Sequence, residues 1–591
     1  MRTERSDTPI FGFNRARSGI VDEVVQRVCS SVRDPLHALN DAAYLETRRL
    51  GNSHGAELAE WRALAGALGK MSDAEQRAKL EDLTRRYAWD IAGNFDPRVY
   101  KFASKMAAPL IGVFLSPRST LRNIHHSIDL TSLDNRILVQ GPREHIRKLS
   151  ERGTIIHVPT HLSNLDSVVF GFALERAGLP PATYGAGKNL FTNPVLSYFM
   201  HNLGAYRVDR RLKHTLYKDV LKAYSCILIE RGYHSLFFPG GTRSRSGGVE
   251  RRLKLGLAGT GVEAFARSAQ RDAERPRRIF FVPATISYLV TLEAETLIED
   301  FLQEAGKTRY IIEDDESSRV ERVASFANKL LKHDGGVVIR FGEPLDPFGN
   351  RVDEEGRSHD GRGRVVDPVS FVRDKDGAVV VDGDRDAQYT RELGEAVCAS
   401  YLRHTVVLAT HVVATVMMNR LRRAARTDDL FALLRVRQRV AVPRGEVARE
   451  AAELRDELLT LEDAGRVVVG PGLRGASGEA IVREALRAWE GTHASHVVEA
   501  EGGELVVGDA PLVFYYQNRL AAHGLALDVL APKRELTPQL SRERSTAASD
   551  GAASGASASS RFFVAFCSYS ARRFPGSSRS AARSHWWAAS R

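Results

Sequence analysis

The sequence is poor in the features that mark secreted, metal-binding or membrane-spanning proteins. Its four cysteines, Cys29, Cys226, Cys398 and Cys567, lie far apart and show no metal-ligand spacing, so no disulfide framework is indicated. The first ten residues hold no apolar signal core. No run reaches the roughly 18 apolar residues that a spanning helix needs. These absences favour a reducing, cytosolic compartment.

What the chain does contain is typical of globular protein. Of its 591 residues, 43% are hydrophobic and 27% are charged, which suits several domains. The net charge of +11 suits three partners, namely nucleic acid, an anionic membrane, or phosphorylated and acidic substrates. Two apolar stretches, 106–115 and 405–418, are too short to cross a bilayer. We expect buried helices there, with shallow insertion into a membrane surface as the alternative.

Alternating strand and helix patterns predict an α/β domain at residues 100–346, with a mostly parallel sheet flanked by helices. The strands are expected at 154–158, 182–185, 205–208, 235–238, 279–286 and 337–341. The helices between them are expected at 165–177, 194–203, 215–231 and 261–268.

The regions on either side are predicted to be helical. Residues 1–95 read as a helical accessory domain, and residues 389–535 as a mostly helical C-terminal domain. Residues 347–388, rich in Gly, Asp and Arg, are expected to be a linker or loop, and 541–591 a disordered basic tail. No internal repeat is evident. The pattern of 441–469, helix, helix and strand, resembles a winged-helix unit.

The stretch T-I-I-H-V-P-T-H-L-S-N-L-D, residues 154–166, carries the first candidate site. An apolar strand leads to His161, and Asp166 follows five residues later, a little more than one helical turn. If a helix begins there, Asp166 lies close enough to orient the imidazole and to stabilise its charged form. His161 is then a candidate general base for a hydroxyl nucleophile. A capping histidine beside a solvated aspartate is the alternative.

Two further stretches at predicted strand ends indicate anion binding. The first, G-A-Y-R-V-D-R-R, ends in two arginines, which offer bidentate forks to a phosphate. The second, F-F-P-G-G-T-R-S-R, brings glycines, hydroxyls and arginines together after a buried strand, as an oxyanion-binding nest does. A solvated helix start and a polar turn are the alternatives. The candidate substrate-binding residues are Arg210, Arg211, Gly241, Thr242, Arg243, Ser244, Arg245 and Lys254, with Lys188 as a weaker candidate.

These blocks, together with a fourth, V-P-A-T-I-S-Y at 282–288, resemble the glycerolipid acyltransferase family, and its glycerol-3-phosphate branch in particular. His161 and Asp166 match the HX4D signature of that family. The resemblance covers 153–346 and extends weakly to T-V-V-L-A-T-H-V-V-A-T-V-M-M and F-Y-Y-Q-N-R-L. Two departures stand out. The family commonly has Glu where this chain has Gly240, and Val208-Asp209-Arg210 is closer to the lysophosphatidate branch, with Arg211 as a possible compensation.

The resemblance implies acyl transfer from acyl-CoA or acyl carrier protein to the sn-1 hydroxyl of glycerol 3-phosphate. His161 would be the base, Asp166 would orient it, and the arginines would hold the phosphate. The resemblance implies no metal, cofactor or acyl-enzyme. The implied place is the cytoplasmic face of an anionic membrane, peripheral or monotopic. Lysophosphatidate acylation, a winged-helix nucleic-acid-binding role and a catalytically silent membrane scaffold are the alternatives.

Overall fold

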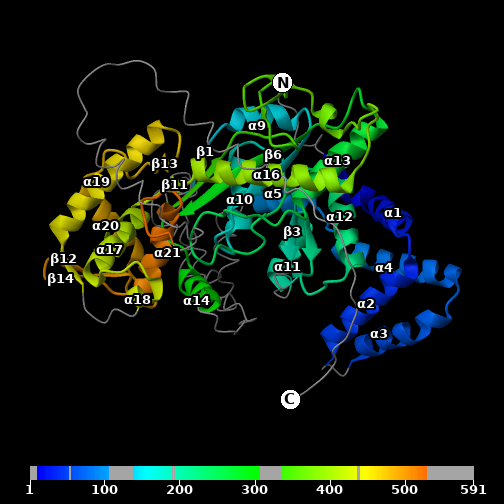
Figure 1. Cartoon of the computed structure of the whole chain (residues 1–591), viewed down its shortest axis with the longest axis horizontal. Coiled ribbons are helices and arrows are strands. Elements are labelled where there is room, and N and C mark those ends of the chain that lie inside the picture. Colours follow the sequence, from blue (N-terminus) through cyan, green and yellow to red (C-terminus); the bar gives the residue numbers. More distant parts are fainter. Residues whose placement is uncertain are drawn as a thin grey trace, which may run out of the picture. The chain divides into compact units, whose positions relative to one another are not determined.

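The computed structural model describes residues 9–51, 55–105, 137–188, 191, 194–305, 336–434 and 440–528 (Figure 1). The chain divides into two compact units, 1–529 and 530–591, and the account below concerns the first. The apolar stretch 106–115 and the tail 541–591 lie outside the described residues.

A seven-stranded sheet forms the centre of the α/β domain. From β6 through β2, β5 and β3 to β4 the neighbouring strands are parallel, whereas β7 pairs antiparallel to β6, and β1 parallel to β7. A mostly parallel sheet is therefore confirmed, although β1 was not predicted. The strands are β1 Ile137–Gln140, β2 Thr154–Pro159, β3 Thr183–Gly187, β4 Ala205–Val208, β5 Ser235–Leu236, β6 Ile279–Tyr288 and β7 Val337–Phe341.

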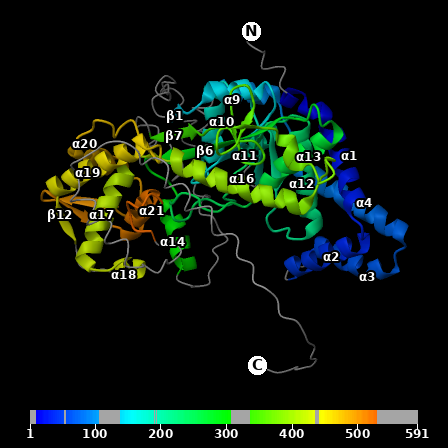
Figure 2. The ribbon, with the colours of Figure 1, turned by 45° about the horizontal axis from the view of Figure 1, so that its top comes forward.

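Helices cover both faces of this sheet, because successive side chains of a strand point to opposite faces. On β2, Ile155 packs into one core with Phe170 of α10, while Ile156 packs into another with Val262 of α13. Helix α16 also packs along β6, as Figures 1 and 2 show. The helices of this domain are α9 Arg143–Ser150, α10 Asp166–Arg176, α11 Pro194–Asn202, α12 Thr215–Glu230, α13 Ala258–Arg271, α14 Ala294–Ala305 and α16 Gly383–His404.

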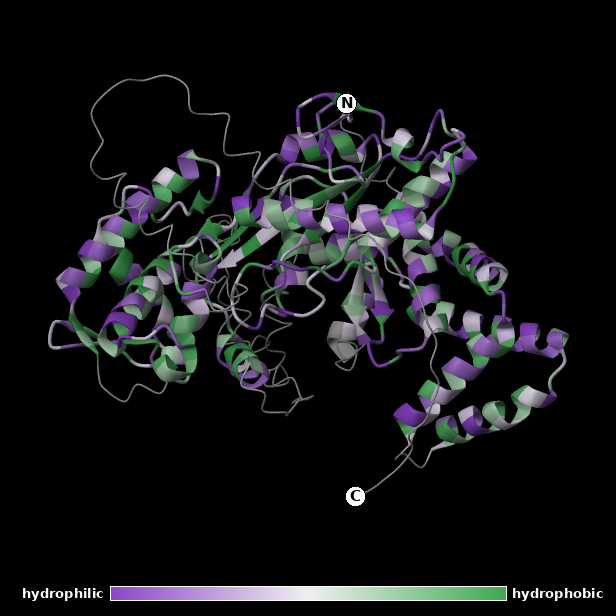
Figure 3. Cartoon of the chain, viewed as in Figure 1, coloured by the Kyte–Doolittle hydropathy of each residue, from purple (hydrophilic) through white to green (hydrophobic). Residues whose placement is uncertain are grey.

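Five α-helices of the described residues precede the sheet, as the charged N-terminal sequence predicts. They are α1 Phe13–Ser31, α2 Pro35–Leu50, α3 Ala56–Ala67, α4 Asp73–Ile91 and α5 Pro97–Lys105. A capping box of Ser72 and Glu75 fixes the start of α4. Hydrophilic and hydrophobic residues alternate along these helices in Figure 3, as in amphipathic helices with one buried face. Their apolar faces share a core with α12, so they are anchored on the α/β domain.

Residues 347–388 differ from the linker we expected. Four aspartates spaced by multiples of seven residues, Asp346, Asp353, Asp360 and Asp374, each accept a hydrogen bond from the backbone N–H four residues later. Each has a glycine of positive φ three residues on, which allows the tight turn. The turns support strands β8 Arg351–Val352, β9 Ser358–His359 and β10 Val365–Val366. The segment is thus an internal repeat of Asp-x-x-Gly turns, and the prediction of no repeat was wrong.

The C-terminal part is built on α17, Ala409–Ala425. Residues 404–418 are buried throughout, which confirms a buried helix within the apolar stretch 405–418. Around α17 pack helices α20 and α21, and α19 packs against both α17 and α20. The remaining elements are β11 Val406–Val407, α18 Leu430–Leu434, β12 Ala441–Pro443, α19 Arg444–Asp463, β13 Val468–Val469, α20 Gly478–Trp489, β14 Val498–Glu501, β15 Glu504–Val507 and α21 Ala510–Ala521.

Residues 441–469 contain one long helix, α19, where the sequence pattern predicted two. Together with α20 and the antiparallel sheet β12-β15-β14, they give the element order of a winged helix. The tip of the β14–β15 hairpin carries the exposed Glu501 and Glu504, and the exposed surface of α20 mixes both signs of charge. The negative charge of this hairpin tip would be repelled by a phosphate backbone, so this unit does not favour nucleic-acid binding.

Candidate active site

The predicted histidine and aspartate meet in a loop between β2 and α10. The Nδ1 of His161 lies 2.8 Å from Oδ2 of Asp166, and Asp166 is completely buried. The same carboxylate oxygen accepts hydrogen bonds from the backbone N–H groups of Leu162 and Ser163, at 2.5 and 3.0 Å. The other oxygen accepts one from the hydroxyl of Tyr288, at 2.6 Å. Helix α10 begins only at Asp166, so a loop wrapped around the carboxylate, and not a helical turn, brings the pair together.

The ring of His161 is fixed on one side and accessible on the other. It stacks on Phe238, with 4.4 Å between ring centroids, and its side chain keeps 17% of its surface exposed. Since Asp166 is the acceptor at Nδ1, the Nδ1–H tautomer leaves a lone pair on Nε2. Among the described residues, Nε2 has no hydrogen-bond partner. The ring can therefore take up a proton at Nε2.

The backbone of His161 is held from both sides by the segment that follows β5. Its N–H donates to Oε1 of Glu250 at 2.8 Å, and its carbonyl accepts from the N–H of Ser244 at 2.7 Å. The hydroxyl of Ser244 donates to the carbonyl of Gly248, at 2.8 Å, and so folds this segment back on itself. The first and third sequence blocks thus form one connected unit.

A part-buried glutamate, Glu293, links Arg243 to the loop 161–164. Glu293 accepts hydrogen bonds from the Ser163 hydroxyl and the Asn164 N–H, at 2.9 and 3.0 Å. Nη1 of Arg243 lies 3.5 Å from Oε1 of the same glutamate. Burial raises the pKa of Glu293, and the charge of Arg243 opposes that rise. Arg243 is therefore held close to the loop 161–164.

Arg210 lies near enough to Arg243 for their charges to interact. Arg210 is exposed, but partial desolvation of its guanidinium lowers its pKa, and the positive charge of Arg243 lowers it further. No hydrogen bond or ion pair to Arg210 is found in the described part of the chain. Guanidinium groups whose charges interact in this way are suited to binding an anion.

The other predicted binding residues are distributed differently. Arg211 is engaged by Asp209 through Nε and Nη2, at 3.0 and 2.8 Å, and Arg245 pairs with Glu304 of α14 at 2.8 Å. Thr242 is exposed in the same loop. Lys188 pairs with Asp90 at 2.9 Å. Of the predicted arginines, Arg210 and Arg243 are thus the two whose charges interact with each other.

Gly241 and Lys254 shape the loop. Gly241 adopts a φ of 74°, which favours glycine, and a side chain there would collide with Cδ of Lys254. The N–H of Lys254 donates to the carbonyl of Pro239 at 2.6 Å. The stem of Lys254 thus lies over the glycine turn.

Helix α21 supports this site from the C-terminal part, which sequence reasoning did not assign to it. Nδ2 of Asn518 donates to the carbonyl of Ser246 at 2.8 Å, and Nη2 of Arg519 donates to that of Ile286 at 2.7 Å. A side chain at Gly247 would meet the carbonyl of Tyr515 at 2.4 Å, so only glycine allows this approach. The stretch F-Y-Y-Q-N-R-L is therefore buried because it braces the third block.

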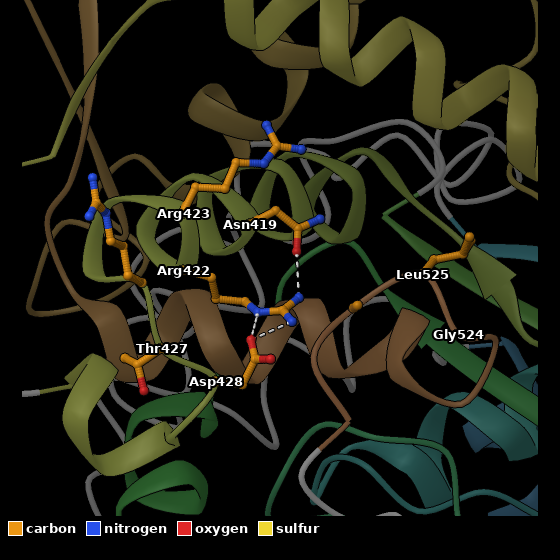
Figure 4. A pocket seen from close by; sticks show the side chains of 9 residues that line it. Asn419, Arg422, Arg423, Thr427, Asp428, Gly524 and Leu525 are labelled. Atoms are coloured by element: carbon orange, nitrogen blue, oxygen red, sulfur yellow. Dashed lines mark hydrogen bonds and ion pairs between the residues drawn. The ribbon is translucent and has the colours of Figure 1, made fainter. Parts of the chain in front are cut away.

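A separate open cavity of about 580 Å³ lies in the C-terminal part, at the end of α17 (Figure 4). Arg422 in it pairs with Asp428 at 2.6 Å and bonds to Asn419, and Arg423 pairs with Glu450 at 3.2 Å. None of the predicted site residues lines this cavity. Its arginines are largely neutralised, so it does not compete with the His161 site.

Comparison with known proteins places the α/β domain in a family. Residues 137–287 match the acyltransferase family. The chain is 29% identical over 293 residues to a glycerol-3-phosphate acyltransferase of Pseudomonas paraeruginosa, which is 49% of this chain and 31% of that protein. It is 28% identical over 264 residues to one of Xanthomonas axonopodis pv. citri, which is 44% of this chain and 25% of that protein.

A solved structure also matches, the 1-acyl-sn-glycerophosphate acyltransferase PlsC of Thermotoga maritima. The match covers 51% of this chain and 92% of that one, with 14% identity and a TM-score of 0.24, too low to support a conclusion.

The part of the chain that carries His161 and Asp166 therefore matches the acyltransferase family and is similar to glycerol-3-phosphate acyltransferases. It spans less than a third of the length of the two glycerol-3-phosphate acyltransferases named above.

Proposed function

We propose that this chain is an O-acyltransferase of phospholipid biosynthesis, which transfers a fatty acyl group from acyl-CoA or acyl carrier protein to the sn-1 hydroxyl of glycerol 3-phosphate. The observation that carries the proposal is the His161–Asp166 pair, with a buried carboxylate on Nδ1 and an accessible Nε2. The names of the relatives support the choice of acceptor.

The chemistry follows from that pair. Nε2 of His161 takes the proton of the acceptor hydroxyl while the oxygen attacks the thioester carbonyl. Asp166, already the acceptor at Nδ1, stabilises the imidazolium that forms. When the tetrahedral intermediate collapses, the carbon–sulfur bond breaks, and the leaving thiolate takes the proton from Nε2 of His161. The product is an oxygen ester and a free thiol.

The acceptor's phosphate would bind between Arg210 and Arg243. Both guanidinium groups are permanently charged and offer several donors to a phosphate. Their attachment to the loops that follow β4 and β5 would place the hydroxyl of a short phosphorylated alcohol near Nε2. Such positioning contributes more to catalysis than proton transfer alone.

We also propose a peripheral position at the cytoplasmic face of an anionic membrane, because the acyl product is lipid-like and the chain is basic. No helix among the described residues is long and apolar enough to span a bilayer. Binding of the purified chain to vesicles of anionic and of zwitterionic lipid would test this position. Equal binding to both kinds of vesicle would contradict an electrostatic attraction of the chain to anionic lipid.

The deciding experiment offers purified enzyme three acceptors in parallel, namely glycerol 3-phosphate, dihydroxyacetone phosphate and lysophosphatidate, with acyl-CoA or acyl carrier protein as the donor. We expect the highest kcat/KM with glycerol 3-phosphate. The second candidate is lysophosphatidate, which the Val208-Asp209-Arg210 sequence and the capture of Arg211 by Asp209 favour. A preference for lysophosphatidate would replace the first proposal by the second.

A further inference from the structure

The third sequence block has glycine where the family it resembles commonly has glutamate. This residue, Gly240, is absent from the described glycines of positive φ, whereas its neighbour Gly241 is among them. The backbone at 240 is therefore open to any amino acid. The reason for glycine must lie in the space around it.

That space is already occupied by another glutamate. A Cβ atom at Gly240 would lie 3.2 Å from Oε1 and 3.4 Å from Cγ of Glu250, ten residues downstream. Such contacts are tighter than most real Cβ contacts. Glu250 reaches this point because the segment after Ser244 turns back, with the Lys254 N–H bonded to the Pro239 carbonyl. The chain thus brings a carboxylate to the place where a side chain at 240 would begin.

The carboxylate of Glu250 is built into the site. Its Oε1 accepts the backbone N–H of His161 at 2.8 Å, while its Oε2 is buried and has no hydrogen-bond partner in the described part of the chain. Burial raises the pKa of Glu250, and the His161 hydrogen bond and the charge of Arg519 counteract the rise. Arg519 is itself buried, and Glu250 is the largest of the charges that offset its burial.

We propose that Glu250 replaces the glutamate missing from position 240. It acts as a positioning residue that fixes the backbone of His161, with the buried Arg519 as its charge partner. The proposal rests on the proposed function for its activity readout. It also makes a prediction about folding stability that does not depend on that function.

A swap experiment tests the replacement. Glu250→Ala should lower kcat by about 10–100-fold with little change in acceptor KM, because the base shifts while the arginines stay in place. Gly240→Glu alone should also lower kcat by at least about 10-fold, because two carboxylates are forced together. The double variant Gly240→Glu/Glu250→Ala should recover to within about 5-fold of the unmodified chain. A double variant no more active than Glu250→Ala would overturn the proposal.

Two further variants separate positioning from general damage. Glu250→Gln keeps an oxygen acceptor for the His161 N–H and should stay at least about 10-fold more active than Glu250→Ala. Glu263→Ala, which breaks only an i,i+4 pair with Arg267 on α13, should match the unmodified chain. Equal losses in Glu250→Gln and Glu250→Ala would overturn the backbone role.

Thermal unfolding of the same proteins supplies the readout that needs no activity. Each single variant should melt at a lower temperature than the unmodified chain, and the double variant should recover. If the unmodified chain transfers no acyl group to any acceptor, the proposed function fails. The melting temperatures of the four proteins still test whether Glu250 replaces a glutamate at position 240. If the double variant loses the sum of the two single losses in melting temperature, the proposed replacement is wrong.

Discussion

The two sides of His161 are built on different principles. On the inner side lie three carboxylates, the buried Asp166 and the part-buried Glu250 and Glu293, and each accepts hydrogen bonds from the loop 161–164. On the outer side lie the more solvent-accessible arginines and lysine of the loops that follow β4 and β5. The inner groups fix geometry, whereas the outer groups are placed to meet a charged substrate. Loss of an inner group should therefore change kcat, and loss of an outer group should change KM.

The largest effect is expected at the base itself. His161→Ala should lower kcat by about 10²–10⁴-fold, because the proton acceptor is removed while the fold is retained. Asp166→Asn should fall in the same range, because an amide no longer stabilises the imidazolium. Acyl-transfer rates of folded variants, checked by circular dichroism, measure this. Acyl transfer at the unmodified rate by either variant would contradict the roles assigned to His161 and Asp166.

The next effect concerns the outer side. Arg243→Ala should raise the KM for glycerol 3-phosphate by about 10–100-fold, since a charge-assisted hydrogen bond is lost. Its matched control is Arg245→Ala, whose guanidinium already pairs with Glu304 at an exposed position, and whose KM should change by less than about 3-fold. Initial rates over a range of acceptor concentrations separate the two. Equal KM values in both variants would show that the phosphate binds elsewhere.

A smaller effect is expected at Tyr288. Removing its hydroxyl in Tyr288→Phe takes one hydrogen bond from the buried carboxylate of Asp166, while Nδ1 of His161 and two backbone donors remain. We expect kcat to fall by about 10-fold, with an unchanged KM. Steady-state kinetics at saturating donor measure it. A raised KM instead would move this tyrosine to the substrate side.

The smallest effect concerns folding stability. It comes from His157, which is buried, whereas His161 is partly exposed. His157 is buried on β2 with no hydrogen-bond partner for its ring nitrogens in the described part of the chain, and burial lowers its pKa to about 3. Below pH 6.5 the unfolded chain takes up a proton there that the folded chain does not. Stability should therefore fall as the pH drops, by about 1.4 kcal/mol per pH unit for this residue until the pH nears 3.

Urea unfolding of the whole chain at pH 7, 6 and 5 measures that dependence. His157→Leu should show a shallower fall than the unmodified chain, and the exposed His37→Leu should show the same fall. An identical slope in all three proteins would contradict the linkage.

Local patterns predicted much of the fold. β4 and β7 have the predicted bounds, and most other elements of the sheet differ by one to three residues, because buried strands and amphipathic helices carry strong periodic signals. The short strand β1 and the turns of 347–388 were not predicted. The signal for the turns was present, since aspartates recur every seven residues from Asp346, each but Asp367 with a glycine three positions on.

The site was predictable only where its residues are close in sequence. The spacing of His161 and Asp166 pointed to the pair, although a loop and not a helix makes it. Glu250, Glu293 and Arg519 come from distant segments, and no spacing rule connects them to His161. Such contacts depend on the whole fold. The choice among the arginines also required the structure, since only the structure shows that Asp209 pairs with Arg211 and Glu304 with Arg245.

The support of the site by α21 has a consequence for synthesis of the chain. Asn518 holds the carbonyl of Ser246, 272 residues earlier in the sequence. At roughly 5–20 residues per second, the ribosome finishes the loop on the order of tens of seconds before it makes the helix that braces it. A nascent chain thus carries the loop without this support until α21 has been made and has docked, and the proposed acyl-transfer site is complete only then.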